Sequence, residues 1–183
     1  MVDAIRPVAS REVYRNPWLT LRVDDVVFAG GAGGEFAVVE KGDFALVLPY
    51  ADGGFWLVEQ YRYPMRRRSW EFPQGAWGAD GSGTAEQLAH AELREETGLR
   101  AERLDHLGRL ASAPGHVTNS FDAYLATGLT AGAPEREATE ADMVHAFVAE
   151  DELIDMIRTG AVIDSNSVAA LLLLRLWRDG RPS

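Results

Sequence analysis

The sequence predicts an α+β fold, a sandwich in which a mixed sheet packs against helices and is preceded by N-terminal strands. Strand-like and helix-like segments are mixed along the chain without the regular alternation that a doubly wound parallel sheet requires. The 183 residues, 46% of them hydrophobic, suffice for one compact domain with a real core. We expect an N-terminal strand segment at residues 1–41 and a main domain at residues 42–183.

Alternating apolar and polar residues indicate the strands. In the N-terminal segment this alternation predicts two strands, around residues 19–23 and 36–38, joined by a glycine-rich turn at residues 30–34. The glycine spacing loosely resembles a dinucleotide-binding loop, but a strand follows it where that loop needs a helix. The residues Ala-Asp-Gly-Gly at 51–54 are a hairpin signal. The remaining predicted strands are 44–48, 55–59, 107–111, 121–126 and 144–148.

Three helices are expected, at residues 84–97, 151–158 and 167–178. The first has clear ends, since Thr84 and Gln87 have the spacing of a capping box and Gly98 is a natural stop.

Charge and composition exclude several classes of function. The formal net charge of −10 argues against nucleic-acid or membrane-surface partners, which require positive surfaces. The absence of cysteine excludes disulfides and cysteine metal sites. The first residues lack the apolar core of a signal peptide, and the apolar run at 168–174 is too short to span a bilayer. A cytoplasmic location is therefore expected.

The first helix carries three glutamates on one face. Glu92, Glu95 and Glu96 are three and four residues apart, so their like charges converge and repel. One interpretation is a solvated acidic surface. The other is a site for hard divalent cations, since Mg²⁺ prefers carboxylate oxygens. Upstream, the residues Trp-Glu-Phe-Pro-Gln-Gly at 70–75 indicate the end of a strand that closes into a Pro/Gly turn, which could bring Glu71 and a backbone carbonyl to this helix.

These segments together resemble the Nudix hydrolases. The residues Glu-Leu-Arg-Glu-Glu-Thr-Gly-Leu at 92–99 match the second half of the family signature, and Gly75 is similar to its opening glycine. The first half departs from the pattern. The interval after Gly75 is two residues longer, Gly83 stands where the signature has its first glutamate, and Ala91 stands where it has an arginine. In the family that arginine orients a glutamate, so its loss bears on turnover, and Arg94 is the first candidate to replace it.

Further segments are similar to the ADP-ribose and nucleotide-sugar pyrophosphatase branch, at residues 57–64, 70–73, 151–154 and 160–174. The resemblance implies a Nudix-type α/β/α sandwich and metal-dependent hydrolysis of a nucleoside-diphosphate sugar such as ADP-ribose. It also implies Mg²⁺, with Mn²⁺ as an alternative. The implied metal ligands are Glu92, Glu96, the shared ligand Glu95 and the carbonyl of Gln74.

The resemblance also implies catalytic and substrate-binding residues. Glu95 would contribute to catalysis, and the general base would come from the acidic loop at 135–142, with Glu140 favoured over Glu137. An exposed acidic loop without catalytic function is the alternative. Arg62 would contact the diphosphate, with Glu71, Trp70 and Arg66 also at the substrate. Trp70 could instead be core packing, and the basic run at 65–69 could be a solvated turn. The four histidines show no metal-ligand spacing.

Two further expectations concern partners and alternatives. The branch typically forms dimers through N-terminal strands, so residues 1–41 would assemble a homodimer. The degenerate first half of the signature leaves open a Nudix-fold module that binds a nucleotide without hydrolysing it. It also leaves open an enzyme for another nucleoside-diphosphate derivative, a dinucleoside polyphosphate, a coenzyme A derivative or a nucleoside triphosphate.

Overall fold

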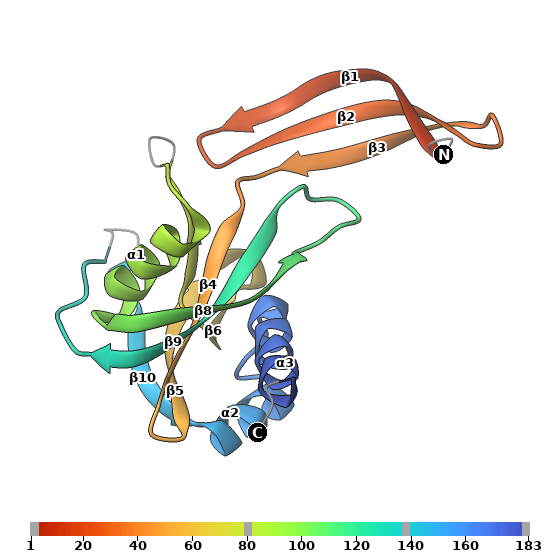
Figure 1. Cartoon of the computed structure of the whole chain (residues 1–183). Coiled ribbons are helices and arrows are strands. Elements are labelled where there is room, and N and C mark those ends of the chain that lie inside the picture. The colour runs from red at the N-terminus through yellow and green to blue at the C-terminus, as the bar shows by residue number, and fades with distance from the viewer. Residues whose placement is uncertain (1–3, 79–81, 137–139, 181–183) are drawn as a thin grey trace. The chain divides into compact units, whose positions relative to one another are not determined.

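The computed structural model describes residues 4–78, 82–136 and 140–180. The chain divides into two compact units. The first comprises the N-terminal segment as far as Asp43, Trp77 and Gly78, and residues 110–121; the second comprises the remaining described residues. The secondary structure of each unit is drawn in Figure 1.

The first unit contains an antiparallel sheet of three strands, β1 (Ile5–Asn16), β2 (Leu19–Phe28) and β3 (Gly33–Glu40). The two predicted strands and the glycine-rich turn between them are confirmed. The prediction was wrong in lacking β1, whose side chains are almost all exposed. Because neither face of β1 is buried, its sequence lacks the two-residue burial period that identifies a strand.

The second unit is built on a larger sheet, with the strand order β10-β5-β4-β9-β8 and with β6 paired to β5 and β7 to β4. Three helices accompany it, α1 (Ala85–Thr97), α2 (Glu150–Thr159) and α3 (Ser165–Asp179). A short 3₁₀ helix spans Tyr63–Met65. The strands are β4 (Phe44–Ala51), β5 (Gly54–Arg62), β6 (Arg67–Glu71), β7 (Gln74–Ala76), β8 (Arg100–Ala111), β9 (Ser120–Thr130) and β10 (Val144–Ala149).

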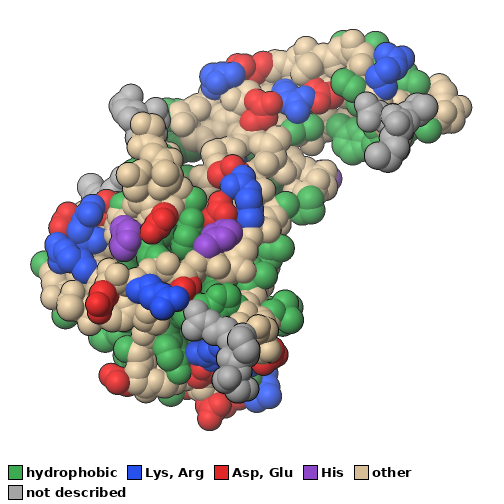
Figure 2. Space-filling view, in the orientation of Figure 1, with side chains coloured by type: hydrophobic (Ala, Val, Ile, Leu, Met, Phe, Trp, Pro, Cys, Tyr) green, Lys and Arg blue, Asp and Glu red, His purple; other side chains and the backbone are tan. Residues whose placement is uncertain are grey.

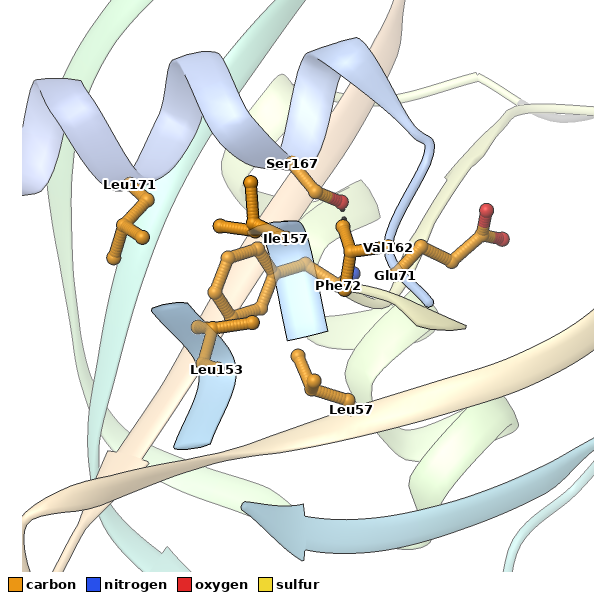
Figure 3. A pocket seen from close by; sticks show the side chains of 8 residues that line it. All are labelled: Leu57, Glu71, Phe72, Leu153, Ile157, Val162, Ser167 and Leu171. Atoms are coloured by element: carbon orange, nitrogen blue, oxygen red, sulfur yellow. Dashed lines mark hydrogen bonds between the residues drawn. The ribbon is translucent and has the colours of Figure 1, made fainter. Parts of the chain in front are cut away.

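Strand β4 separates the two helical layers of this unit. Ala45 and Val47 join a buried cluster with Leu88 and Leu93 of α1. Leu46 and Leu48 are equally buried and, by the alternation of a strand, point to the opposite face. The side chains of α2 and α3 on that side meet β5 and Phe72 around a closely packed apolar centre (Figure 3). The predicted α+β sandwich is therefore confirmed.

The turn and capping signals of the sequence also have their expected geometry. Asp52 and Gly53 both have positive φ, 46° and 80°, as a two-residue hairpin turn requires. The Thr84 side chain accepts from the Gln87 amide, and the Gln87 side chain accepts from the Thr84 amide. Gly98 ends α1 in the left-handed region, with φ 77°. These local signals fix the start and the end of the helix that carries the glutamates.

The strand end expected at residues 70–71 is confirmed as the end of β6, whereas β7 and the start of β6 at Arg67 were not expected. The basic run at 65–69 is not wholly a turn, because β6 begins at Arg67 and pairs with β5, and Gln74–Ala76 pairs with β4 as β7. Segments of five and three residues are too short for a periodicity to show in the sequence. Within the described ranges, the helices are too short or too polar to cross a bilayer.

Candidate active site

Glu96 is the most deeply placed of the acidic residues on α1. Its side chain is 2% exposed, although a carboxylate normally faces water. Glu96 lies on the buried face of α1, because Leu93 and Thr97 of the same helix are also buried. One carboxylate oxygen accepts a hydrogen bond of 3.1 Å from the backbone N–H of Gln74. The turn at residues 73–75 therefore lies directly against the last turn of α1.

Gly75 brings the same turn against Glu92. A Cβ atom at Gly75 would stand 2.6 Å from the carboxyl carbon of Glu92 and still closer to both of its oxygens. A side chain at position 75 would therefore require the Glu92 carboxylate, the far end of a flexible side chain, to move. The glycine that carries the family resemblance therefore has a steric role here.

Burial and neighbouring charge raise the pKa of Glu96 well above its usual value. Burial is the larger cause, and the carboxylates of Glu92, Glu140 and Glu71 follow in that order. The hydrogen bond from Gln74 opposes the shift but does not cancel it. We call Glu71, Glu92, Glu96 and Glu140 the acidic group. Carboxylates from β6, α1 and the loop before β10 thus act electrostatically on Glu96.

Glu71 joins the acidic group to a basic side chain. It is 1% exposed, and it accepts a 2.6 Å hydrogen bond from Gln60 and two hydrogen bonds from the Arg62 guanidinium. Burial raises the pKa of Glu71 to about 7 even though the charge of Arg62 lowers it. Figure 3 shows the carboxylate turned away from the apolar residues that surround its neighbour Phe72.

A cleft of about 300 Å³ opens beside this ion pair. Asp164 lies on its wall and caps the N-terminus of α3, accepting from the amide of Ser167 at 2.8 Å. The Gln74 side chain donates a 2.9 Å hydrogen bond to Asp164, so the wall of the cleft is tied to the turn beside Glu96. The lining residues are Arg62, Pro64, Met65, Ser69, Glu71, Ile163, Asp164 and Ser165.

Other expected site residues lie differently. Glu95 is paired with the adjacent Arg94 at 2.9 Å, and the same guanidinium reaches Glu135 at 3.3 Å. Trp70 is half-buried in β6 and paired with Glu59 of β5, and it does not line the cleft. Arg66 is exposed, with a positive φ of 54° at the end of the 3₁₀ helix. Glu137 lies outside the described residues.

The sequence reasoning missed three residues that hold this region together. Gln60 donates a hydrogen bond to Glu71, and Asp164 accepts one from Gln74. Arg136 donates to the backbone carbonyl of Glu96. A signal existed for Asp164 alone, because Asp-Ser-Asn-Ser at 164–167 is a helix start. The other two depend on contacts between distant parts of the chain.

The donors of the acidic group fit a hard divalent cation in chemical type. Mg²⁺ and Mn²⁺ take carboxylate oxygens, and a cation would relieve the repulsion that now raises the pKa of Glu96. Over the described ranges, no three acidic or histidine side chains already stand as a formed metal-binding group.

Comparisons with known proteins identify the family of this chain. Residues 40–171 match the NUDIX domain, and residues 5–39 match the nucleoside diphosphate sugar hydrolase N-terminal domain. An ADP-ribose pyrophosphatase of Mycobacterium tuberculosis is 36% identical over 94% of this chain and 84% of its own. A methanol dehydrogenase activator of Bacillus methanolicus is 28% identical, over 93% of this chain and 92% of its own. An ADP-ribose pyrophosphatase of Bacillus subtilis is 25% identical, with the same two coverages.

The likeness extends to three dimensions. The crystal structure of an ADP compounds hydrolase superposes with a TM-score of 0.85 at 19% sequence identity, covering 98% of this chain and 97% of that one. At that identity the superposition establishes the shared fold. The family match over residues 40–171 and the 36% identical relative establish more: the chain belongs to the Nudix hydrolase family.

Proposed function

We propose that this chain hydrolyses the pyrophosphate bond of a nucleoside-diphosphate sugar, with ADP-ribose as the first candidate. The products would be a nucleoside monophosphate and a sugar phosphate. The acidic group around the buried Glu96 is the observation that carries the proposal. The match of residues 5–39 to a nucleoside diphosphate sugar hydrolase segment and the names of two relatives support the substrate class.

Glu92 and Glu96 would be the principal ligands of Mg²⁺, or of Mn²⁺ in its place. Glu95 would share in the ligation, and the carbonyl of Gln74 would complete the protein's contribution. When bound, the metal would neutralise the diphosphate and acidify the attacking water. The ion pair of Glu95 with Arg94 orients that side chain from outside the acidic group.

Glu140 is our candidate for the general base. As the water oxygen bonds to phosphorus and the bond from that phosphorus to the bridging oxygen breaks, Glu140 would take the proton that the water loses. The leaving phosphate would keep the electrons of the broken bond. The support for Glu140 is its place in the acidic group, where its charge acts on Glu96.

Arg62 would bind the diphosphate beside the cleft. Its side chain is 39% exposed although it is paired with Glu71, so part of the guanidinium is open to an anionic ligand. The cleft volume of about 300 Å³ is at the lower end for small-molecule sites, which fits one half of a nucleotide sugar. We retain Glu71, Trp70 and Arg66 as further candidates for substrate contacts.

A product-resolved assay tests this proposal. The purified chain is incubated with ADP-ribose, other nucleotide sugars, dinucleoside polyphosphates, coenzyme A and nucleoside triphosphates, with Mg²⁺ or Mn²⁺, and the products are separated. We expect AMP and ribose 5-phosphate in equal amounts from ADP-ribose, and none with EDTA. Faster turnover of another substrate would replace ADP-ribose as the assigned substrate and leave the assignment to the Nudix family unchanged. Binding of ADP-ribose without turnover would instead support a nucleotide-binding module.

We also propose that the first unit mediates a homodimer, with residues 1–41 as the dimerisation segment and 42–183 as the hydrolase domain. Large apolar side chains are exposed in this unit, including Val13 of β1 at 49% and Trp18 in the turn between β1 and β2 at 76%. Figure 2 shows hydrophobic side chains on the surface of the molecule. A three-stranded sheet with so much exposed apolar surface gains stability by burying it against a second copy.

A further inference from the structure

The candidate base Glu140 begins a short turn at residues 140–143, just before β10. The amide of Met143 donates a 2.9 Å hydrogen bond to the Glu140 carbonyl and closes the turn. The Met143 side chain is 2% exposed and therefore anchors the end of the turn in the core. We call residues 140–143 the Glu140 turn.

Arg136 ties the Glu140 turn to the end of α1. Two of its guanidinium nitrogens each donate a 3.0 Å hydrogen bond to the carbonyl of Glu96. A third nitrogen donates to the carbonyl of Met143 at 2.5 Å, and the group also meets Nδ1 of His145 at 2.7 Å. One side chain thus connects the helix of the acidic group, the end of the turn and the start of β10.

Arg68 holds the same turn from the sheet. In β6 it is bonded to the Glu59 carboxylate at 2.8 Å and to the Glu59 carbonyl at 3.1 Å. Its other donors reach the carboxylate and the carbonyl of Asp142, at 2.7 and 3.0 Å. Arg68 belongs to the basic run at 65–69, and its guanidinium is engaged with Glu59 and Asp142.

From these contacts we propose that Arg136 and Arg68 are positioning residues that hold Glu140 within the acidic group. The inference rests on the proposed role of Glu140 as the base. Like charges on Glu140 and Glu96 disfavour the placement of Glu140 near Glu96, so this placement needs contacts that hold the turn. Two arginines bound to residues 142 and 143, just after Glu140, hold the turn from the helix side and from the sheet side.

Arginine suits this function better than lysine. A guanidinium has five donors in a fixed plane and can bond acceptors from several elements at once, whereas an ammonium group is a compact point charge. Replacement by lysine therefore keeps the charge but loses the fixed geometry. Misplacing a catalytic group by about 1 Å can reduce turnover by roughly a hundredfold.

The test combines Arg136→Lys and Arg68→Lys with Glu140→Gln in double-mutant cycles. Arg178→Lys serves as the matched control, since Arg178 pairs with Glu150 away from the turn. For each protein, kcat and KM are measured with ADP-ribose and Mg²⁺, together with the melting temperature. Amide hydrogen exchange at residues 140–145 reports the turn itself, whether or not ADP-ribose is hydrolysed.

We expect each turn variant to lower kcat by about ten- to a hundredfold, with KM changed by less than about threefold. Amide exchange at 140–145 should accelerate in both, while Arg178→Lys leaves kcat and this exchange as in the wild type. In the Glu140→Gln background the lysine substitutions should lower kcat by less than about twofold further, because the base they position is already lost.

The outcomes separate the two levels of the proposal. Equal losses with and without Glu140 would show that the arginines act independently of it, which overturns their positioning role and leaves the base assignment standing. Unchanged amide exchange in both lysine variants would also overturn the positioning role. A Glu140→Gln variant with wild-type kcat would overturn the base and, with it, the reason for positioning.

Discussion

Glu71 has a buried carboxylate for which the neighbouring Arg62 does not fully compensate. Burial raises the pKa of Glu71 from its ordinary value of 4.5 to about 7. The folded protein therefore binds this proton more readily than the unfolded chain. The resulting stability is complete below pH 4.5 and is lost as the pH rises through about 7.

We therefore expect the wild type to lose stability relative to Glu71→Gln as the pH rises from about 5 to 8. The measurement is the melting temperature of both proteins across this range in EDTA. Millimolar Mg²⁺ should reduce the effect, because a cation near the acidic group favours the charged carboxylate. A difference in melting temperature that stays constant with pH would contradict the assignment.

We propose that Arg94 replaces the arginine that the family signature has at the position of Ala91. Its guanidinium holds Glu95 at 2.9 Å, so it orients a neighbouring glutamate from a position three residues further along α1. We expect Arg94→Ala to lower kcat about tenfold, at the low end for a charge-assisted hydrogen bond because the pair is partly exposed.

In the Arg94→Ala background, Ala91→Arg should restore part of kcat with little change in KM. Steady-state kinetics with ADP-ribose measures both, and the melting temperature shows whether the new arginine is tolerated at a half-buried position. A folded Arg94→Ala protein with wild-type kcat would mean that Glu95 needs no such orientation.

Several glutamates that the sequence singled out act electrostatically on one another at Glu96 in the structure, and their functional roles stay predictions. Glu92 and Glu96 followed from helical spacing, and Glu71 from the turn that precedes the helix. The ion pair of Glu95 with Arg94 was not foreseen, because adjacent residues on a helix do not normally face each other. The choice of Glu140 over Glu137 came from resemblance, and its place beside Glu96 needed the tertiary structure.

At the scale of elements, the turn at residues 73–75 packs against helix α1 at both Glu92 and Glu96. Gly75→Ala would place a methyl group into the Glu92 carboxylate. We expect this variant to weaken Mg²⁺ binding and to lower kcat by about tenfold or more, since the Glu92 carboxylate would have to leave its present position. Titration calorimetry with Mg²⁺ and a kinetic assay measure the two effects.

Gly78→Ala is the matched control, because a Cβ at Gly78 meets nothing within 4 Å. This variant should bind Mg²⁺ and turn over substrate as the wild type does. If Gly75→Ala behaves like Gly78→Ala, the close packing of Glu92 against the turn has no role in the site.

Elements whose ends are set by local sequence signals could be predicted from the sequence. Elements whose structure depends on pairing with distant strands could not. The capping box of α1, its terminal glycine and the Asp52-Gly53 turn each specify their own backbone conformation. Strand β1 has no buried face, and β6 and β7 are too short to show a period. The connection of Asp164, at the N-terminus of α3, to the turn beside Glu96 depends on a tertiary contact, its hydrogen bond from Gln74.

At the scale of the whole molecule, the exposed strands of the first unit raise the question of assembly. We expect a homodimer at micromolar concentration, measured by light scattering after size-exclusion chromatography. The double variant Val13→Asp/Trp18→Asp should dissociate it, because buried charges on an apolar interface are unfavourable. The control Val168→Asp/Leu172→Asp, which changes exposed positions on α3, should remain dimeric. A monomeric wild type would contradict the proposal.

The central claim is that the acidic group on α1 binds a divalent metal and cleaves a nucleotide sugar. Glu96→Gln tests it most directly, because the substitution keeps the side-chain size and removes one charge from the centre of the group. The measurement is the rate of AMP release from ADP-ribose with Mg²⁺, for wild type and variant, alongside Mg²⁺ calorimetry and the melting temperature. We expect a folded variant with weakened Mg²⁺ binding and at least a roughly hundredfold lower rate. A variant that binds Mg²⁺ and releases AMP as the wild type does would show that the site lies elsewhere.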